Sequence, residues 1–172
     1  MAGESVKVGE QRYRERFGRY FEDFAVGDVY EHRPGRTISE ADNTWFTLLT
    51  MNTHPIHFDA EYAKHTEFGK PQVVSTLTLS ILVGMSVSDT SQKAIANRGW
   101  KDIKLPGPVF AGDTLYAEST VLEKRDSRSR PDQGIVSIRT IGRNQRGEVV
   151  CEFDRTILVM KRGSSLEDRA GY

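Results

Sequence analysis

The sequence predicts an α+β fold in one continuous domain, with its helices in the first half and an antiparallel sheet in the second. Two observations lead to this prediction. An apolar segment of helical period covers residues 75–88, and four runs rich in β-branched residues follow it, separated by turn signals. Consecutive strands with short connections pair as an antiparallel meander, which excludes a βαβ alternation.

Composition narrows the classes of function. The chain has 172 residues with 24 Lys plus Arg, 24 Asp plus Glu and one cysteine. A balanced charge lacks the basic field on which nucleic-acid binding depends, and no apolar run approaches the ~20 residues of a membrane span. One cysteine forms no internal disulfide, and the polar, charged N-terminus is unlike a secretory signal. We therefore expect no nucleic-acid or membrane partner and a cytoplasmic protein.

The two ends of the chain are polar and show no helical or strand period. We expect residues 1–18 and 163–172 to be loose tails. No linker, repeat or low-complexity segment divides residues 19–162, which predicts a single domain there. Within it, the charged and turn-rich residues 124–133 are typical of a hairpin connection.

A short helix is predicted at about residues 40–50, after an extended segment that ends at Thr37. Ser39 can serve as its N-cap, and Asp42, three positions later, can complete a capping box. Its apolar residues recur at i, i+3 and i+4, which gives the helix one apolar face: Trp45, Leu48 and Leu49.

The predicted central helix, residues 75–88, carries apolar stripes on two opposite sides. One stripe is Leu77, Ile81 and Met85, and the other is Leu79, Val83 and Val87. A helix that is apolar on opposite sides is buried on most of its surface. We therefore expect a sheet to wrap around it.

Four runs supply that sheet: residues 98–105, 113–124, 134–143 and 149–160. The Pro-Gly-Pro at 106–108 ends the first run, because proline lacks the N–H that a ladder needs. In the last run apolar and polar residues alternate, so one face of that strand is expected to be buried.

The residues richest in potential chemistry lie around Pro55: Asn52, His54, His57 and Asp59. His57 is the best candidate for an acid/base group, because imidazole titrates nearest to neutral pH and polar neighbours can fix its tautomer. Two alternatives stay open. His57 can be a structural histidine satisfied by one hydrogen bond, or His54, His57 and Asp59 can be metal ligands, although no further ligand completes a tetrahedron.

A second candidate lies at the start of the predicted central helix. The segment 68–71 (FGKP) leads into Ser75 in the first turn. Unpaired N–H groups at a helix N-terminus lie at the positive end of the dipole, so they can bind a carbonyl oxygen that becomes an oxyanion. The alternative is that Ser75 is a plain N-cap.

These segments resemble the MaoC-like, (R)-specific enoyl-CoA hydratases of the hot-dog fold. The resemblance rests on residues 20–28 (YFEDFAVGD), 55–63 (PIHFDAEYA), 68–71 (FGKP) and 108–115 (PVFAGDTL). It implies an antiparallel sheet wrapped around a long central helix. It also implies a homodimer or higher homo-oligomer and a CoA-thioester substrate in a tunnel at the interface. CoA is part of that substrate, so the resemblance implies no separate cofactor and no metal.

The family's hydratase motif looks like an Asp, a short gap, Asn-Pro, an apolar residue and His. Its His falls on His57, its Asp on Asn52 and its Asn on His54. An amide cannot accept a proton at neutral pH. The resemblance therefore leaves three possibilities: His57 is the sole base and Asn52 orients the water, a carboxylate such as Asp59 or Asp42 contributes, or the chain is inactive.

The family's oxyanion donor, the amide of a glycine, falls on Ser75, where a backbone N–H survives the substitution. Residues 42–47 and 84–87 are most similar to the branch that acts on mesaconyl-CoA or itaconyl-CoA. The implied activity is hydration of a short, branched or dicarboxylic 2-enoyl-CoA thioester, or the reverse dehydration. The alternative is an acyl-CoA-binding or thioesterase hot-dog protein, and Asn52 is the residue that keeps it open.

The CoA phosphates implied by the resemblance need basic side chains at the tunnel mouth. Arg125, Arg128 and Arg130 in the turn-rich connection are the candidates. The alternative is that they lie on a solvated charged hairpin.

Overall fold

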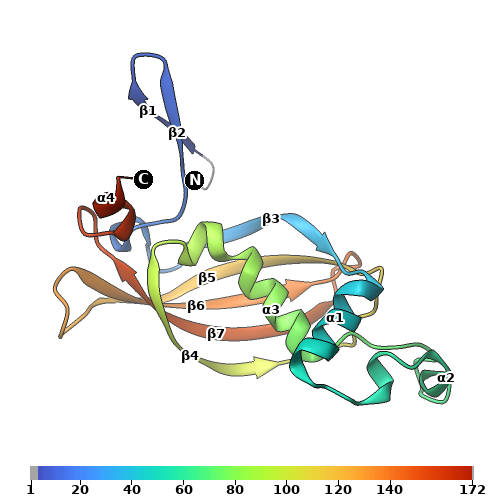
Figure 1. The fold of residues 1–172 in the computed structure, drawn as a ribbon. Coiled ribbons are helices and arrows are strands. Elements are labelled where there is room, and N and C mark those ends of the chain that lie inside the picture. Colours follow the sequence, from blue (N-terminus) through green and yellow to red (C-terminus); the bar gives the residue numbers. More distant parts are fainter. Residues whose placement is uncertain (1–3, 172) are drawn as a thin grey trace.

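The computed structural model describes residues 4–171, and its centre is a five-stranded antiparallel sheet packed against one helix (Figure 1). The strand order is β3-β5-β6-β7-β4. The strands are β3 (Val29–Thr37), β4 (Ala94–Lys104), β5 (Thr114–Asp126), β6 (Gln133–Arg143) and β7 (Val149–Met160). The helix α3 (Ser75–Met85) crosses the sheet. This confirms the α+β class, and each of the four predicted strand runs forms one strand.

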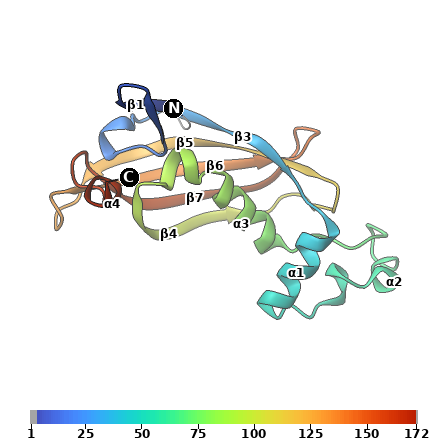
Figure 2. The same ribbon diagram turned by 45° about the horizontal axis from the view of Figure 1, so that its top comes forward.

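Short helices gather beyond the end of the sheet where α3 begins. They are α1 (Glu40–Thr50), the 3-10 turn η2 (Pro55–His57) and α2 (Ala60–Ala63). Figures 1 and 2 show α1 and α2 projecting from this end in both views. At the other end lie the 3-10 turn η1 (Phe21–Asp23), the π-helical turn η3 (Val87–Ser91) and α4 (Leu166–Ala170). The segment with the candidate chemistry is therefore held outside the sheet, next to the N-terminus of α3.

The capping box predicted for α1 is present. The amide of Asp42 donates to Ser39 Oγ at 3.1 Å, and the amide of Ser39 donates to Asp42 Oδ2 at 2.8 Å. The apolar face of α1 is exposed, however, at 66% for Trp45, 67% for Leu48 and 78% for Leu49. The helix α1 lies beyond the end of the sheet, so within one chain few residues cover its apolar face.

The prediction that the central helix is buried on most sides is wrong within a single chain. Leu77, Thr78 and Leu82 are buried, whereas Leu79 and Val83 are only half-buried. The sheet contacts α3 from one side. Between α3 and the edge strand β4 is an open cavity of about 410 Å³, lined by Thr76, Leu79, Ser80, Val83, Trp100 and Ile103.

The side of α3 that faces the sheet packs into the main core. The core residues around it include Leu77, Leu82, Leu115, Val150 and Phe153. Close contact with β6 depends on Gly142, because a Cβ there would lie 2.3 Å from Leu82 Cδ1. This glycine therefore sets how closely α3 approaches the sheet.

Regular structure extends into both segments that we expected to be loose tails. Residues 4–16 form a hairpin of β1 (Glu4–Gly9) and β2 (Arg12–Arg16), and α4 forms near the C-terminus. Residues 1–3 and 172 of the expected tails lie outside the described residues. Polar contacts that have no sequence period hold the two ends together, such as Arg14 Nη1 donating to the carbonyl of Gly171 at 2.9 Å.

Candidate active site

His57 is the last residue of η2, and a backbone carbonyl orients its ring. Its Nδ1 lies 2.9 Å from the carbonyl oxygen of Gln72. A carbonyl only accepts hydrogen bonds, so Nδ1 carries the proton and Nε2 has a free lone pair. Nε2 is therefore the ring atom that can remove a proton.

Two other polar side chains in this segment cap short helices. Nδ1 of His54 accepts from the amide of Ile56 at 3.2 Å at the start of η2, where Pro55 fixes the backbone. Asp59 Oδ1 accepts from the amide of Tyr62 at 3.0 Å at the start of α2. Between residues 4 and 171, no three His, Cys, Asp or Glu side chains are grouped to hold a metal ion.

Asn52 lies in the same loop as His57, directly after the left-handed residue Met51 that ends α1. Its Oδ1 accepts from the amide of His54 at 3.2 Å. Its Nδ2 donates to no atom of the described chain. Asn52 can therefore present an N–H donor to a water molecule while its oxygen is fixed by the backbone.

Ser75 begins α3, and its amide has no acceptor among residues 4–171. The N-cap residue, Val74, provides no side-chain cap. Ser75 lines a cavity of about 230 Å³, and Gln72, whose carbonyl orients His57, lines the same cavity. His57 itself does not line this cavity, but it contacts Gln72, which lines the cavity together with Ser75.

The carboxylates that were alternatives to Asn52 are engaged elsewhere. Asp42 Oδ1 lies 2.7 Å from Arg36 Nη2. Hydrogen bonds from the backbone and side chain of Ser39 hold the pKa of Asp42 below its usual range. Asp59 caps α2, and neither carboxylate hydrogen-bonds to His57 in the structure. The described contacts thus give no support to a carboxylate base beside His57.

The chain does not bring Arg125, Arg128 or Arg130 to His57. Strand β5 starts at Thr114, beside the start of α1, and ends at Asp126. At ~3.3 Å per residue, those ends are about 40 Å apart. Arg125 Nε lies 3.5 Å from Glu123 Oε1, and Arg130 Nη1 donates to Gln133 Oε1 at 3.4 Å. That these three arginines bind the CoA phosphates stays a prediction, and the structure of a single chain gives it no support.

Basic side chains lie nearer to the candidate site. Lys70 follows Phe68, which lines the 230 Å³ cavity, and its Nζ lies 4.2 Å from the ring centre of Phe110. Lys104 precedes Leu105, another residue of that lining, and its Nζ lies 3.7 Å from Glu152 Oε1. Lys70 belongs to the segment 68–71 named above, but neither it nor Lys104 was assigned a binding role from the sequence.

A buried chain of side chains has the order of a hydrolase triad. His32 Nε2 lies 2.8 Å from Ser119 Oγ, and His32 Nδ1 lies 3.2 Å from Asp89 Oδ2. Ser119 and His32 are fully buried, and Thr140 Oγ1 lies 2.8 Å from Ser119 Oγ. Burial lowers the pKa of His32. Because the serine is fully buried, a substrate cannot reach it, and these side chains give no support to a hydrolase. Their hydrogen bonds connect η3 to the sheet.

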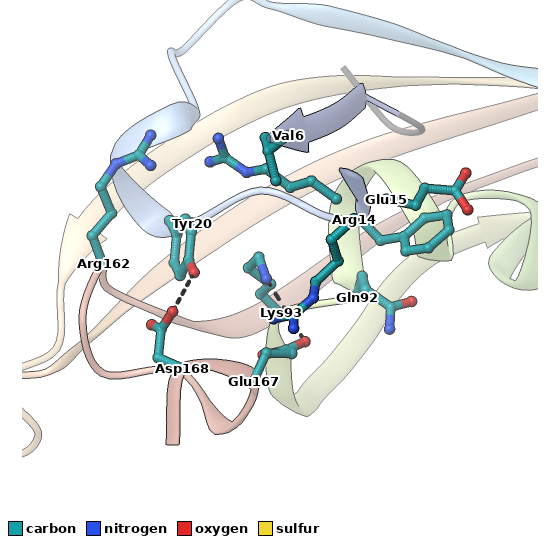
Figure 3. Close-up of a pocket in the computed structure, with 11 residues that line it drawn as sticks. Val6, Arg14, Glu15, Tyr20, Gln92, Lys93, Arg162, Glu167 and Asp168 are labelled. Carbon is teal, nitrogen blue, oxygen red and sulfur yellow. Dashed lines mark hydrogen bonds and ion pairs between the residues drawn. The ribbon is translucent and has the colours of Figure 1, made fainter. Parts of the chain in front are cut away.

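A cavity of about 480 Å³ lies between the N-terminal hairpin and α4, and Figure 3 shows its charged lining. Tyr20 Oη donates to Asp168 Oδ1 at 2.9 Å, and Lys93 Nζ lies 3.8 Å from Glu167 Oε1. None of the predicted site residues lines this cavity. These two contacts connect α4 to Tyr20 and to Lys93, the residue before β4.

Asn43 is the polar residue of the site that sequence analysis missed. It is buried on α1, and its side chain hydrogen-bonds to the backbones of His57, Gln72 and Val74. The available signal was an asparagine one residue after the capping box, where a buried helix position is usually apolar.

None of the described helices is long and apolar enough to cross a membrane.

Comparison with known proteins identifies the family of the chain. A family model described as mesaconyl-CoA hydratase matches residues 7–171. The chain is 34% identical to the mesaconyl-CoA hydratase of Cereibacter sphaeroides, covering 86% of this chain and 43% of that protein. It is 30% identical to the (R)-specific enoyl-CoA hydratase of Rhodospirillum rubrum, covering 84% and 94%. The chain thus spans less than half the length of the mesaconyl-CoA hydratase that it matches.

Solved structures show the same fold. A MaoC-like dehydratase from Rhodospirillum rubrum is 33% identical and superposes with a TM-score of 0.74 over 84% of this chain and 99% of that chain. A Mycobacterium tuberculosis protein described as a double hotdog fold is 20% identical, with a TM-score of 0.79 over 87% and 47%. The chain has the hot-dog fold.

Proposed function

The chain belongs to the mesaconyl-CoA hydratase family, and on this basis we propose that it adds water to a short, branched or dicarboxylic 2-enoyl-CoA thioester, or removes it. One observation carries the proposal. The bond between His57 Nδ1 and the Gln72 carbonyl leaves Nε2 free, and Gln72 lines the same cavity as Ser75, the first residue of α3, whose amide is unpaired. Base and oxyanion donor are the two groups that this addition needs.

The mechanism uses three groups of the chain. Asn52 Nδ2 donates to the oxygen of a water molecule, and His57 Nε2 takes one of its protons as the oxygen bonds to the β-carbon. The π electrons move onto the thioester oxygen, where the Ser75 amide stabilises the enolate. The proton on His57 is then delivered to the α-carbon, and the carbonyl re-forms. Dehydration follows the same steps in reverse.

This reaction needs no oxidant, reductant or separate cofactor, because CoA enters as part of the substrate. We also propose a cytoplasmic location. The support is that the single cysteine of the chain, Cys151, is free, which is typical of proteins in a reducing compartment.

A substrate panel tests the proposed activity. The absorbance of the conjugated enoyl thioester is followed with crotonyl-CoA and with methyl-branched dicarboxylic enoyl-CoA esters. We expect absorbance to fall with both classes and faster with the branched dicarboxylic esters. Release of a free thiol would instead indicate a thioesterase, and binding without any absorbance change would indicate an acyl-CoA-binding protein.

We further propose that a second copy of the chain covers the open side of α3, in a homodimer or a higher homo-oligomer. Strand β4 is an edge strand, and Trp100 and Ile103 on it are 43% and 45% exposed. Both residues line the 410 Å³ cavity beside α3. An unpaired edge beside an exposed apolar cavity favours a second hot-dog unit, and relatives of about twice this length have room for one in the same chain.

Sedimentation tests the assembly. At micromolar concentration we expect a species of at least twice 19.4 kDa. Ile103→Glu places a charge in the apolar cavity and is expected to give monomers with little activity. Val29→Glu, an exposed apolar residue on the opposite edge strand β3, is the matched control and should leave the assembly intact. A fully active wild-type species of 19.4 kDa contradicts the proposal.

Replacing Asn52 tests whether it orients the water. Asn52→Ala removes the Nδ2 donor and is expected to lower turnover less than replacement of His57. Asn52→Asp restores the carboxylate of the family motif, so we expect turnover equal to or above wild type. Initial rates with the best ester of the panel measure both. An inactive Asn52→Asp variant would show that the Nδ2 donor, rather than an acceptor at this position, is required.

A further inference from the structure

Asn43 connects three segments that are separate in the sequence. Its Nδ2 donates to the carbonyl of His57 at 2.7 Å and to the carbonyl of Gln72 at 3.2 Å. Its Oδ1 accepts from the amide of Val74 at 2.9 Å. The side chain is 5% exposed, so these bonds form away from water. All three polar sites of the amide that face the protein are therefore used.

The carbonyl of Gln72 accepts two hydrogen bonds. One comes from Asn43 Nδ2 and the other from Nδ1 of His57, at 3.2 Å and 2.9 Å. The donor that fixes the backbone of Gln72 thus also fixes the acceptor that orients the His57 ring. The bond from Asn43 to the carbonyl of His57 holds the same residue from its backbone side.

The remaining bond of Asn43 acts on the oxyanion side of the site. Val74 is the N-cap of α3, and the amide of the next residue, Ser75, is the unpaired donor. Because Asn43 occupies the amide of Val74, the first free donor of the helix is one residue further along. The distance between the base and the oxyanion donor therefore depends on one buried side chain.

We propose that Asn43 is a positioning residue that holds the His57 ring and the N-terminus of α3 in their reactive arrangement. The inference rests on the proposed hydratase function and names a residue that supports its site. Asn43 and Thr47 are the buried residues of α1, whose apolar side is exposed. Few other contacts can replace this connection when Asn43 is changed.

The chemistry requires an amide at this position. Aspartate has the same shape and can still accept from Val74, but it has no hydrogen to donate to the carbonyls of His57 and Gln72. Its charge would also face two carbonyl oxygens. Leucine keeps the volume and removes all three bonds. The two variants therefore separate loss of the donor from loss of the whole connection.

The test combines kinetics with a spectroscopic reading of His57. In Asn43→Leu and Asn43→Asp we expect turnover to fall about 10- to 100-fold, the loss that a displacement of about 1 Å can cause, with KM within about twofold. In ¹⁵N NMR spectra of the imidazole at neutral pH, we expect the Nδ1–H tautomer that dominates in wild type to lose population in both variants.

Asn144 supplies a matched control. It is also buried, and its Oδ1 accepts from the amides of Arg146 at 2.9 Å and Glu148 at 3.1 Å in the β6–β7 turn. Asn144→Leu should lower stability yet leave turnover and the His57 spectrum as in wild type. A merely structural role for Asn43 predicts the same behaviour for both asparagines.

Wild-type turnover and an unchanged His57 spectrum in the Asn43 variants would overturn the proposal, as would equal kinetic losses in Asn144→Leu. If Asn43→Leu does not fold, Asn43→Asp provides the same readings. The spectrum needs no substrate. A tautomer shift limited to the Asn43 variants therefore supports the positioning role even if wild type hydrates no CoA ester, in which case the proposed function alone fails.

Discussion

His57→Gln is expected to lower the turnover number for hydration by about 10²- to 10⁴-fold, the range that a positioned acid/base group supplies. The lone pair at Nε2, freed by the bond between Nδ1 and the Gln72 carbonyl, is the proton acceptor. Glutamine has no comparable base. KM should change little, because the interaction is made in the transition state. Initial rates under saturating substrate measure the effect.

His65→Gln is the control for this prediction, because His65 is an exposed histidine after α2 in the same region. It should keep wild-type turnover. The pH dependence of the rate gives a second check. The pKa of Asp42 is held below its usual range, so a rate that persists into strongly acidic solution would point to that carboxylate instead.

Gly142→Ala is expected to destabilise the fold by about 1–3 kcal/mol or more, the usual cost of overpacking a core. The new Cβ would lie 2.3 Å from Cδ1 of Leu82, which is fully buried. The expected response is displacement of α3 from β6. Because Ser75 begins α3, turnover should fall along with the free energy of unfolding.

Urea unfolding measures the free energy of unfolding of Gly142→Ala, and Gly99→Ala is the control because it is the same substitution at another glycine. A Cβ at Gly99 on β4 meets nothing within 4 Å, so that variant should be close to wild type in unfolding free energy. Equal stabilities for the two variants would show that the contact between β6 and α3 does not set the position of the helix.

Local patterns explain what the sequence could predict. The capping box of Ser39 and Asp42 involves residues three apart. The strands were predicted from runs of β-branched residues bounded by turn residues. His57 could be proposed as a candidate because a histidine two residues after Pro55, at the position of a family motif, is chemically distinctive. Each of these signals lies within a short window of the chain.

Features that depend on contacts between residues distant in the sequence could not be predicted. Asn43 meets Val74, which is 31 positions away, so no local pattern connects them. The open side of α3 depends on which surface the sheet leaves uncovered. The distance of Arg125 from His57 depends on the length of β5, which places the hairpin at the far end of the sheet.

The most direct test of the central claim compares wild type with His57→Gln on a methyl-branched dicarboxylic enoyl-CoA ester. Mass spectrometry of the intact ester is combined with the absorbance of its conjugated double bond. With wild type, the ester should gain one water and lose conjugation while its thioester stays intact, and the variant should leave both almost unchanged. An ester that wild type leaves unhydrated, or that both proteins hydrate equally fast, would contradict hydration by His57.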